Sequence, residues 1–229
     1  MRREMLVLPA VALLAAGAHA VVYNDATGEN FDGNPHMDIV SVAVTNTLSD
    51  ITFTINLNGP IGPGTDWGKY CIGFDYGAAT GDPNSPVGNP WGRNIDMADK
   101  MDAWIGSWVD GGGGAQAWTF DGTNWNLNSS VVPTIGPSST SFTVSLASLG
   151  LVGGETICFD VYTTGGNGGD SANDASANPN QSTTGWGGPY TTPSGRCHVY
   201  EVVVPEPASI SLLGLTGLGL LSRRRAVRA

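Results

Sequence analysis

The chain has 229 residues, a formal net charge of −10 and only 13% charged residues. Its acidity argues against nucleic acid and anionic lipid surfaces as partners, because phosphate groups are bound by clustered basic side chains. Glycine, asparagine, serine and threonine are abundant whereas lysine and glutamate are few, a composition that favours strands and loops over helices.

The start of the chain has the pattern of a secretory signal. Arg2 and Arg3 give a basic start, residues 6–16 form an apolar run, and Ala18 and Ala20 occupy the small-residue site that signal peptidase recognises. A buried N-terminal helix is the alternative, but a proline inside the apolar run argues against it. We therefore expect signal peptidase to cut after Ala20 during export.

Once residues 1–20 are removed, residues 21–204 are expected to form a single domain, which is long enough for a substantial core. This segment holds four basic and eighteen acidic residues, a net charge of −14. Such acidity favours solubility and the binding of divalent cations, and an ordinary solvated acidic surface is the simpler explanation.

Alternation of apolar and polar residues predicts antiparallel strands along this domain. In residues 51–57 isoleucine, phenylalanine and leucine alternate with threonine and asparagine, and valines alternate in the same way in residues 40–44. A turn at residues 45–50 should join these two strands as a hairpin. Further strands are expected at residues 69–76, 102–109, 115–120, 140–149, 156–162 and 197–204.

Eight or nine short strands with glycine-rich connections indicate an all-β protein. We expect a single antiparallel β-sandwich, jelly-roll-like, with long Gly/Asn-rich loops and a removable hydrophobic segment at each end. Asp121 and Gly122 separate two of the expected strands and favour a tight type I′ turn between them.

The longest connection, residues 163–195, has no periodicity of its own. A loop of this length is usually functional or mobile. Asp170 and Asp174 within it offer carboxylate oxygens of the kind that calcium prefers, but they match neither the EF-hand spacing nor a nonapeptide repeat. A calcium site at these two residues is one expectation, and ordinary turn chemistry is the other.

Cys71, Cys158 and Cys197 belong to the exported part of the chain, where a disulfide can persist. Three cysteines allow three single pairings, each of which leaves one thiol over, and their spacing does not choose among them. A zinc-type site is less favoured, because the domain has only two histidines and no CxxC motif.

Four aromatic residues are candidates for binding polysaccharide. Trp186 and Tyr190 lie in the long connection, and Trp67 and Trp91 lie in other connections rich in glycine and proline. Exposed aromatic faces with polar neighbours commonly bind sugars, and anchoring of the loops is the alternative. The tryptophans inside the expected strands are assigned to packing.

The carboxyl end of the chain combines a proline-rich element, an uncharged apolar run and a cluster of arginines. These parts are Pro205, Glu206 and Pro207, then residues 208–222, then Arg223, Arg224 and Arg225. A helix over the run would be about 22 Å long, short of the roughly 30 Å of a hydrocarbon core, so it could span only with bilayer thinning or arginine snorkelling. The arginines should stay on the cytoplasmic side, which leaves the domain outside.

This arrangement, residues 205–229, resembles the PEP-CTERM sorting signal of exopolysaccharide-forming Gram-negative bacteria. The resemblance implies that an exosortase, an integral-membrane cysteine peptidase, recognises residues 205–207 while residues 208–222 are inserted transiently in the inner membrane. It also implies that the arginines act as a stop signal, that the tail is removed, and that the protein reaches the cell surface or the extracellular space. A permanent tail anchor is the alternative.

The domain resembles more loosely the DOMON domains and the family 9 carbohydrate-binding modules. The similarity lies in the segments MDIVSVAVTNTLSDITFTINL, KYCIGFDY and DAWIGSWVDGGGGAQAWTFDGTNW. Those families are sandwiches that bind haem or sugars. No pair of histidine or methionine residues has the spacing of haem ligands, so the resemblance implies sugar binding only.

We therefore expect a non-enzymatic exported surface or matrix protein, without a required cofactor, that binds polysaccharide or packs within the extracellular polymer. One alternative is a secreted glycoside-acting enzyme that uses two carboxylates such as Asp75 and Asp160. That chemistry needs carboxyl groups about 5–9.5 Å apart, which sequence spacing does not reveal. The other alternative is a purely structural matrix protein.

Overall fold

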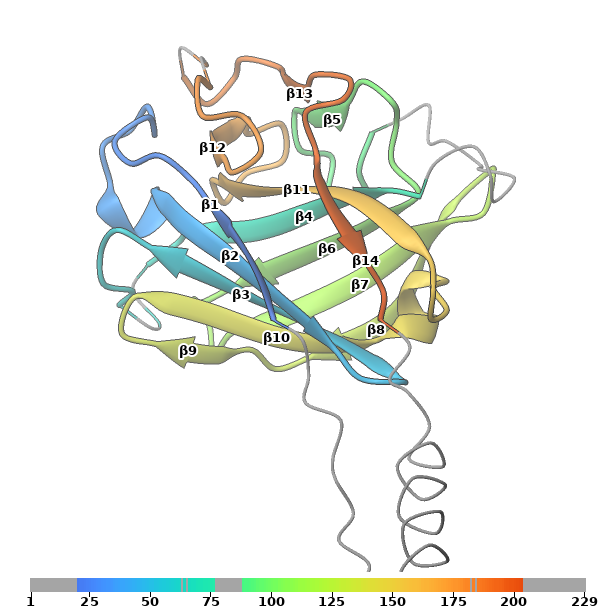
Figure 1. Cartoon of the computed structure of the whole chain (residues 1–229). Helices are drawn as coiled ribbons and strands as arrows, with labels where there is room; N and C mark the ends of the chain where they lie inside the picture. Colours follow the sequence, from blue (N-terminus) through green and yellow to red (C-terminus); the bar gives the residue numbers. More distant parts are fainter. Residues whose placement is uncertain are drawn as a thin grey trace, which may run out of the picture. The chain divides into compact units, whose positions relative to one another are not determined.

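The computed structural model describes residues 20–62, 64, 66–76, 88–181, 183 and 185–203. Within these residues lie fourteen strands and two 3₁₀ helices, η1 (Pro35–Met37) and η3 (Leu146–Leu149). Most of the strands belong to two antiparallel sheets that face each other across a core (Figure 1). The expected all-β sandwich is therefore confirmed.

The first sheet has five strands in the order β1-β2-β3-β10-β9. These strands are β1 (Val21–Asn24), β2 (Ile39–Asn46), β3 (Asp50–Leu57), β9 (Thr134–Gly136) and β10 (Ser139–Ser145). The predicted hairpin is present, because β2 and β3 pair in antiparallel fashion with Val44 opposite Phe53. Every second side chain of β3 is buried, as its alternating pattern indicates.

The second sheet runs in the order β12-β11-β4-β6-β7-β8, and β14 also pairs with β11. Its strands are β4 (Lys69–Asp75), β6 (Ala103–Trp108), β7 (Gly114–Phe120), β8 (Trp125–Val131), β11 (Thr156–Thr164), β12 (Ala172–Ala175) and β14 (His198–Glu201). β14 pairs with the first half of β11, and β12 pairs with its last residues. Two further strands, β5 (Ile95–Met97) and β13 (Tyr190–Thr192), form a short parallel pair.

The inner core lies between the two sheets. Phe53 of the first sheet contacts Phe74 and Phe159 of the second, with ring centroids 5.6 Å apart in both pairs. All three side chains are fully buried. Because burial of one such ring contributes about 1.5–3 kcal/mol, this cluster is a main source of the attraction between the sheets.

An outer apolar layer covers the opposite face of the second sheet. Trp104 of β6 and Tyr162 of β11 project from that face and stack with their ring centroids 6.2 Å apart. Ile95, Met97 and Tyr190 pack in the same cluster. These three lie on β5 and β13, within the connections between β4 and β6 and between β11 and β14, so the long connections and their short parallel pair close this layer.

Two glycines on the outer face leave room for these loops. A Cβ at Gly106 would collide with the indole ring of Trp91, and a Cβ at Gly73 would lie 2.9 Å from Cε of Met101. The rigid indole ring therefore requires a glycine at position 106, whereas at position 73 the end of a methionine side chain could shift to admit a methyl group.

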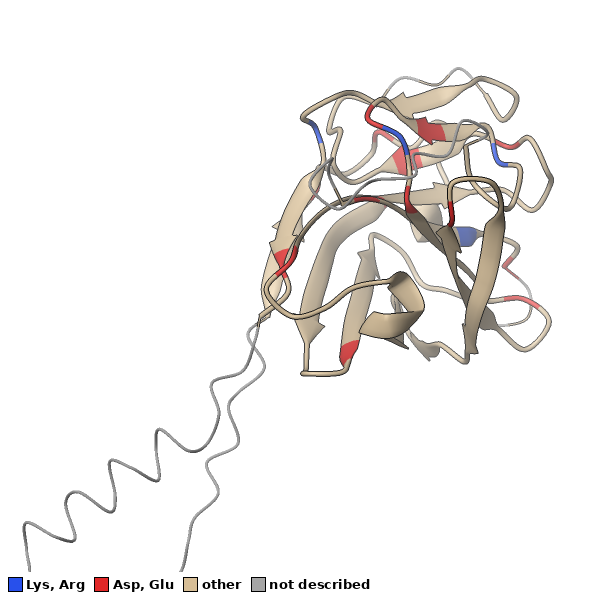
Figure 2. Ribbon diagram, turned by 90° about the vertical axis from the view of Figure 1, so that its right-hand side faces the viewer, with Lys and Arg blue, Asp and Glu red and all other residues tan. Residues whose placement is uncertain are grey.

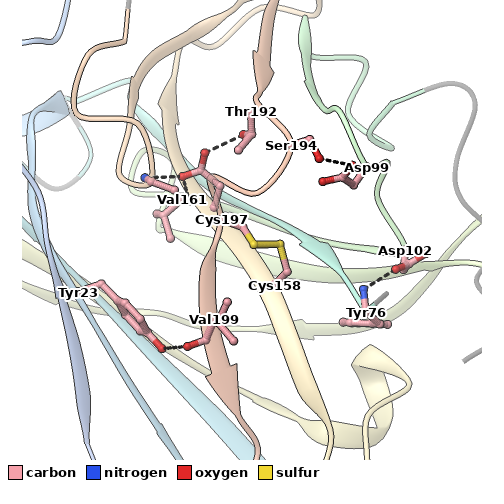
Figure 3. The surroundings of a disulfide bond; sticks show 12 residues. Tyr23, Tyr76, Asp99, Asp102, Cys158, Val161, Thr192, Ser194, Cys197 and Val199 are labelled. Carbon is pink, nitrogen blue, oxygen red and sulfur yellow. Dashed lines mark hydrogen bonds between the residues drawn. A yellow bond between two sulfur atoms is a disulfide. The ribbon is translucent and has the colours of Figure 1, made fainter. Parts of the chain in front are cut away.

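A disulfide joins Cys158 of β11 to Cys197, which precedes β14 (Figure 3). It is one of the three pairings that the sequence leaves open, and it ties the end of the long connection to the second sheet. Cys71 remains a buried free thiol. Burial raises the pKa of this thiol to about 12, so it stays protonated and chemically inert.

The prediction of a type I′ turn at Asp121 and Gly122 is wrong. A type I′ turn needs a positive φ at both central residues, and of these two only Gly122 has one, +93°. Instead β7 and β8 pair as far as Phe120 and Trp125, and the carboxylate of Asp121 accepts two backbone amides within a four-residue loop.

The long connection contains more structure than its sequence indicates. β12 pairs with β11, and β13 pairs with β5, so two short strands lie within residues 163–195. Their register is set by partners distant in sequence. β8 is not among the strands that the sequence predicts; it lies at the edge of its sheet, has no fully buried side chain and lacks a clear alternation of apolar and polar residues.

Charged residues are distributed unevenly over the domain. Figure 2 shows acidic residues on many strand ends and loops, with few basic residues among them. The four basic residues of the domain are Lys69, Arg93, Lys100 and Arg196. Three of them form ion pairs, namely Lys69 with Asp110, Arg93 with Asp170, and Lys100 with Asp96.

The described domain begins and ends at the same end of the sandwich (Figure 1). Val21 starts β1 opposite Val44 of β2. Asn46, the last residue of β2, accepts the amide of Val203 at 3.0 Å and donates to its carbonyl at 2.9 Å. These two bonds fix the last described residue of the domain.

No helix within the described residues is long and apolar enough to cross a membrane. The expected span at residues 208–222 lies outside the described residues, as do Ala18 and the six residues assigned to the sorting signal. Ala20 is described and exposed.

Candidate functional site

Four aromatic side chains from three distant parts of the sequence lie against one another, and we call them the aromatic surface. They are Phe31, His36, Trp67 and Trp186. The ring centroid of Trp186 lies 4.7 Å from that of Phe31 and 5.3 Å from that of Trp67. The centroids of Trp67 and His36 are 6.4 Å apart. All three contacts are edge-to-face, an arrangement that aromatic quadrupoles favour.

Trp67 is the exposed member of the aromatic surface, and Trp186 supports it. Trp67 is 42% exposed, whereas Trp186 is partly buried. Gly165 makes room for Trp186, because a Cβ there would lie 3.2 Å from Cε3 of the indole and would collide with Asp170. The carbonyl of Trp186 accepts the amide of Ser171 at 2.6 Å. The turn between β11 and β12 therefore holds Trp186 in place.

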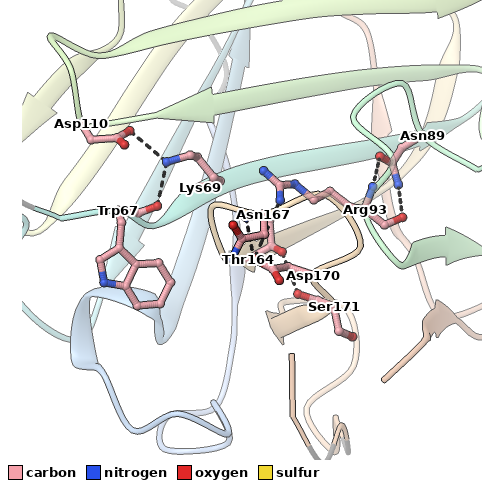
Figure 4. Close-up of polar contacts among 9 residues, drawn as sticks. All are labelled: Trp67, Lys69, Asn89, Arg93, Asp110, Thr164, Asn167, Asp170 and Ser171. Atoms are coloured by element: carbon pink, nitrogen blue, oxygen red, sulfur yellow. Dashed lines mark hydrogen bonds and ion pairs between the residues drawn. The ribbon is translucent and has the colours of Figure 1, made fainter. Parts of the chain in front are cut away.

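Two ion pairs lie near the aromatic surface (Figure 4). The ammonium group of Lys69 donates to the carbonyl of Trp67 at 2.7 Å and to the carboxylate of Asp110 at 2.9 Å. The guanidinium group of Arg93 lies 3.9 Å from the carboxylate of Asp170, and its side chain is only 6% exposed. Both basic groups are thus matched by a carboxylate.

Of the four aromatic residues predicted to bind sugar, the structure brings Trp67 and Trp186 together and places the other two in the outer apolar layer. Trp91 packs over Gly106, and its indole N–H donates to Gln116 at 3.2 Å. Tyr190 is 6% exposed and belongs to the cluster on the outer face of the second sheet.

Phe31 and His36 complete the aromatic surface and were not among the predicted residues. Both lie in the segment between β1 and β2, which contains glycine and proline as the connections of Trp67 and Trp91 do. This shared composition is the one feature of the sequence that could have identified Phe31 and His36 as candidates. Only the fold brings Phe31 next to Trp186.

Asp174, predicted as a calcium ligand, lies in a cluster with Asp25 and Glu29. One carboxylate oxygen from each residue lies within 4.8 Å of the other two, and these are the described residues that could hold a metal ion. Asp170 is not part of this cluster, because its carboxylate faces Arg93. The structure therefore separates the two residues of the expected calcium site.

This acidic cluster is electrostatically unfavourable when all of its carboxylates are charged. Burial, followed by the charges of Asp174 and Glu29, raises the pKa of Asp25 to about 9. Burial also raises the pKa of Asp174 to about 7, although the amides of Ile39 and Ala175 donate to its oxygens. At neutral pH the cluster therefore retains a proton or requires a counter-charge.

Asp75 and Asp160, the pair considered for glycoside chemistry, lie on adjacent strands in the same sheet. Asp160 is fully buried. Its oxygens accept hydrogen bonds from the hydroxyl of Thr192 at 2.7 Å and from two backbone amides at 2.8 and 2.9 Å. Burial raises the pKa of Asp160 to about 7. These contacts indicate a structural role for this carboxylate.

Fold and site together describe an acidic all-β domain with a disulfide, a form suited to an oxidising compartment outside the cytoplasm. Comparison with known families matches residues 203–225 to the PEP-CTERM protein-sorting motif. The expected sorting signal is therefore confirmed. The match begins at Val203, the residue that Asn46 holds at the end of the sandwich.

The chain thus carries a sorting motif of the kind that exosortases recognise, which makes it an exported protein of the cell envelope or surface. No curated protein and no solved structure is significantly similar to the chain. The resemblance of the domain to DOMON domains and family 9 carbohydrate-binding modules is accordingly not confirmed.

Proposed function

We propose that this protein is a non-enzymatic component of the cell surface or extracellular matrix that binds polysaccharide through the aromatic surface. The observation that carries the proposal is the 42% exposure of Trp67 on a base formed with Trp186 and His36. Tryptophan is enriched at binding interfaces, where its ring supplies a large apolar contact area.

The chemistry of sugars fits this arrangement. The C–H faces of sugar rings are apolar and pack on indole rings, while sugar hydroxyls hydrogen-bond to polar side chains nearby. Asp110, whose side chain is 41% exposed, is linked to Trp67 through Lys69. The rings of Trp67 and Trp186 meet at 70°, so they form a corner and not a flat strip. A corner suits one sugar unit of a soluble chain better than the flat face of a crystalline polymer.

Two further observations support a binding role. Glycoside hydrolysis requires two carboxyl groups that flank the scissile bond. Of the candidate pair Asp75 and Asp160, Asp160 is fully buried and so does not reach a substrate. The sorting motif directs the protein to the envelope or surface, where extracellular polysaccharide is found. A domain that binds the polymer would remain with it after removal of the tail.

The test measures how soluble polysaccharides cast into native gels retard the purified exported protein. Trp67→Ala should weaken binding by roughly thirtyfold, because loss of an aromatic anchor commonly costs about 2 kcal/mol. Trp186→Ala should also weaken binding, because Trp186 supports the ring of Trp67. Leu127→Ala is the matched control, since Leu127 is a similarly exposed apolar residue, 46%, on β8.

Equal retardation of the parent and Trp67→Ala in every gel would refute the role of the aromatic surface. Absence of retardation for the parent in all gels would favour the purely structural alternative. Turnover of chromogenic glycosides by the same preparation would favour the enzyme.

A further inference from the structure

We propose that the polysaccharide bound by the aromatic surface is a glycan without acidic groups, that is, one that carries no carboxylate, sulfate or phosphate substituents. This inference rests on the proposed function and adds the chemical class of the ligand. It follows from the charges that surround the four rings.

Carboxylates accompany every segment of the aromatic surface. They are Asp32 beside Phe31 and Asp66 beside Trp67 in the chain, Asp170 next to Gly165 and Trp186, and Asp110 paired with Lys69. The whole domain has the same imbalance, with eighteen acidic and four basic residues. The electrostatic potential at the aromatic surface is therefore negative.

Basic side chains offset two of these four carboxylates, and among the described residues Asp32 and Asp66 have no basic partner. Lys69, whose side chain is 12% exposed, is engaged by Asp110 and by the carbonyl of Trp67. Arg93 is more deeply buried and faces Asp170. The other basic residues of the domain are Lys100, which pairs with Asp96, and Arg196, which precedes Cys197 of the disulfide. Lys69 and Arg93, the lysine and arginine near the aromatic surface, each already have a carboxylate partner.

An acidic polymer would therefore meet repulsion without a compensating ion pair. Proteins usually hold carboxylate, sulfate or phosphate groups with arginine or lysine side chains that are free to form charge-assisted hydrogen bonds. A neutral sugar is not repelled by the carboxylates and can hydrogen-bond to them. Its hydroxyl groups donate to carboxylates, and hydrogen bonds of that kind are stronger than those between neutral groups.

The test compares each neutral polysaccharide with its own carboxymethylated form, so that the backbone and linkages stay the same. Dextran, a β-1,3-glucan, a soluble β-1,4-glucan and a galactomannan supply four pairs. The polymer isolated from the producing bacterium, before and after chemical reduction of its carboxyl groups, supplies a fifth. We expect the exported protein to bind the uncharged form about tenfold more tightly at low salt, with the difference shrinking as salt screens the charges.

A pair of charge variants sharpens the test. Asp110→Asn removes one carboxylate and releases Lys69. It should therefore reduce the ratio between the affinities for the neutral and the carboxymethylated polysaccharide by about threefold. Glu201→Gln makes the same change of net charge on β14, where Glu201 is exposed, and should leave the difference as it is.

Equal or tighter binding of the carboxymethylated forms would overturn the inference. The proposed function would survive that result if Trp67→Ala still weakened the binding of these polymers. Failure of the protein to bind any of these polymers would overturn the inference and the proposed function together.

Discussion

The two faces of the second sheet differ in composition and in what covers them. The inner face packs apolar side chains that alternate along β4, β6 and β11 against the first sheet. The outer face carries tryptophan, tyrosine and cysteine and is covered by connections, with additional methionines among the covering residues. The inner face thus determines the sandwich, whereas the outer layer fixes the loops that surround it.

The outer apolar layer should be the less stable of the two. It buries the carboxylate of Asp160, and the buried indole N–H groups of Trp104 and Trp118 find no acceptor among the described residues. A buried polar group without a partner costs about 1–3 kcal/mol. Because loops and short strands form much of this layer, we expect it to open before the sandwich unfolds.

The largest effect on the outer layer is expected from loss of the disulfide. Replacing Cys158 and Cys197 with alanine removes a cross-link between residues 39 positions apart. In the chain-entropy account this should lower the free energy of unfolding by about 3–4 kcal/mol. Hydrogen exchange should rise mainly in residues 163–197, while the amides of β2 and β3 should stay protected.

Phe53→Ala provides the contrast for the inner core, because Phe53 is fully buried between the sheets. Its loss should cost about 3–5 kcal/mol and should raise exchange in both sheets at once. Equal increases in both layers after removal of the disulfide would show that the two layers open as one unit.

Gly106→Ala tests whether the outer layer is closely packed. The new methyl group would occupy the position of the Trp91 indole, so that the ring and its loop must move. Overpacking of this kind costs about 1–3 kcal/mol. The near-UV circular dichroism of the tryptophans should change while the far-UV spectrum of the sheets stays the same.

The double variant Gly106→Ala, Trp91→Ala is the control for this prediction. Removal of the indole makes room for the methyl group, so the two changes together should cost less than the sum of the single changes. Strictly additive losses would mean that the collision does not cause the destabilisation.

The inner face could be predicted from the sequence because its signal is local. Alternation within β3 indicates which side chains face the core, and the pairing of neighbouring strands follows from short turns. The outer layer depends instead on connections that return to the sheet. The packing role of Gly106 becomes apparent only when Trp91 lies over it, and the partner of Cys158 follows from the pairing of β14 with β11.

The candidate site was predictable in part for the same reason. Trp67 and Trp186 were identified from the composition of their connections, but Trp91 and Tyr190 share that composition and lie in the outer layer. Composition indicates that a residue is in a loop and does not indicate which way the loop turns its ring. The sorting motif, by contrast, is read along the chain, and the sequence therefore sufficed to identify it.

The acidic cluster, which connects β12 to the segment after β1, should make stability depend on pH. Burial, followed by the charges of Asp174 and Glu29, raises the pKa of Asp25 from 3.8 to about 9. Between pH 3.8 and about pH 9, Asp25 keeps its proton in the folded chain and releases it in the unfolded chain. The resulting stabilisation is fully present below about pH 4 and is lost progressively as the pH rises towards about 9.

Asp25→Asn should remove this dependence, because asparagine has a similar shape and no charge. With a chelator present, its melting temperature should be close to the parent's near pH 4 and higher than the parent's at about pH 8.5. Glu201→Gln controls for net charge. If the parent protein had a higher melting temperature than Asp25→Asn at about pH 8.5, the raised pKa of Asp25 would be contradicted. If calcium stabilised the parent and not Asp25→Asn, the calcium expected at Asp170 and Asp174 would instead lie between Asp174 and Asp25.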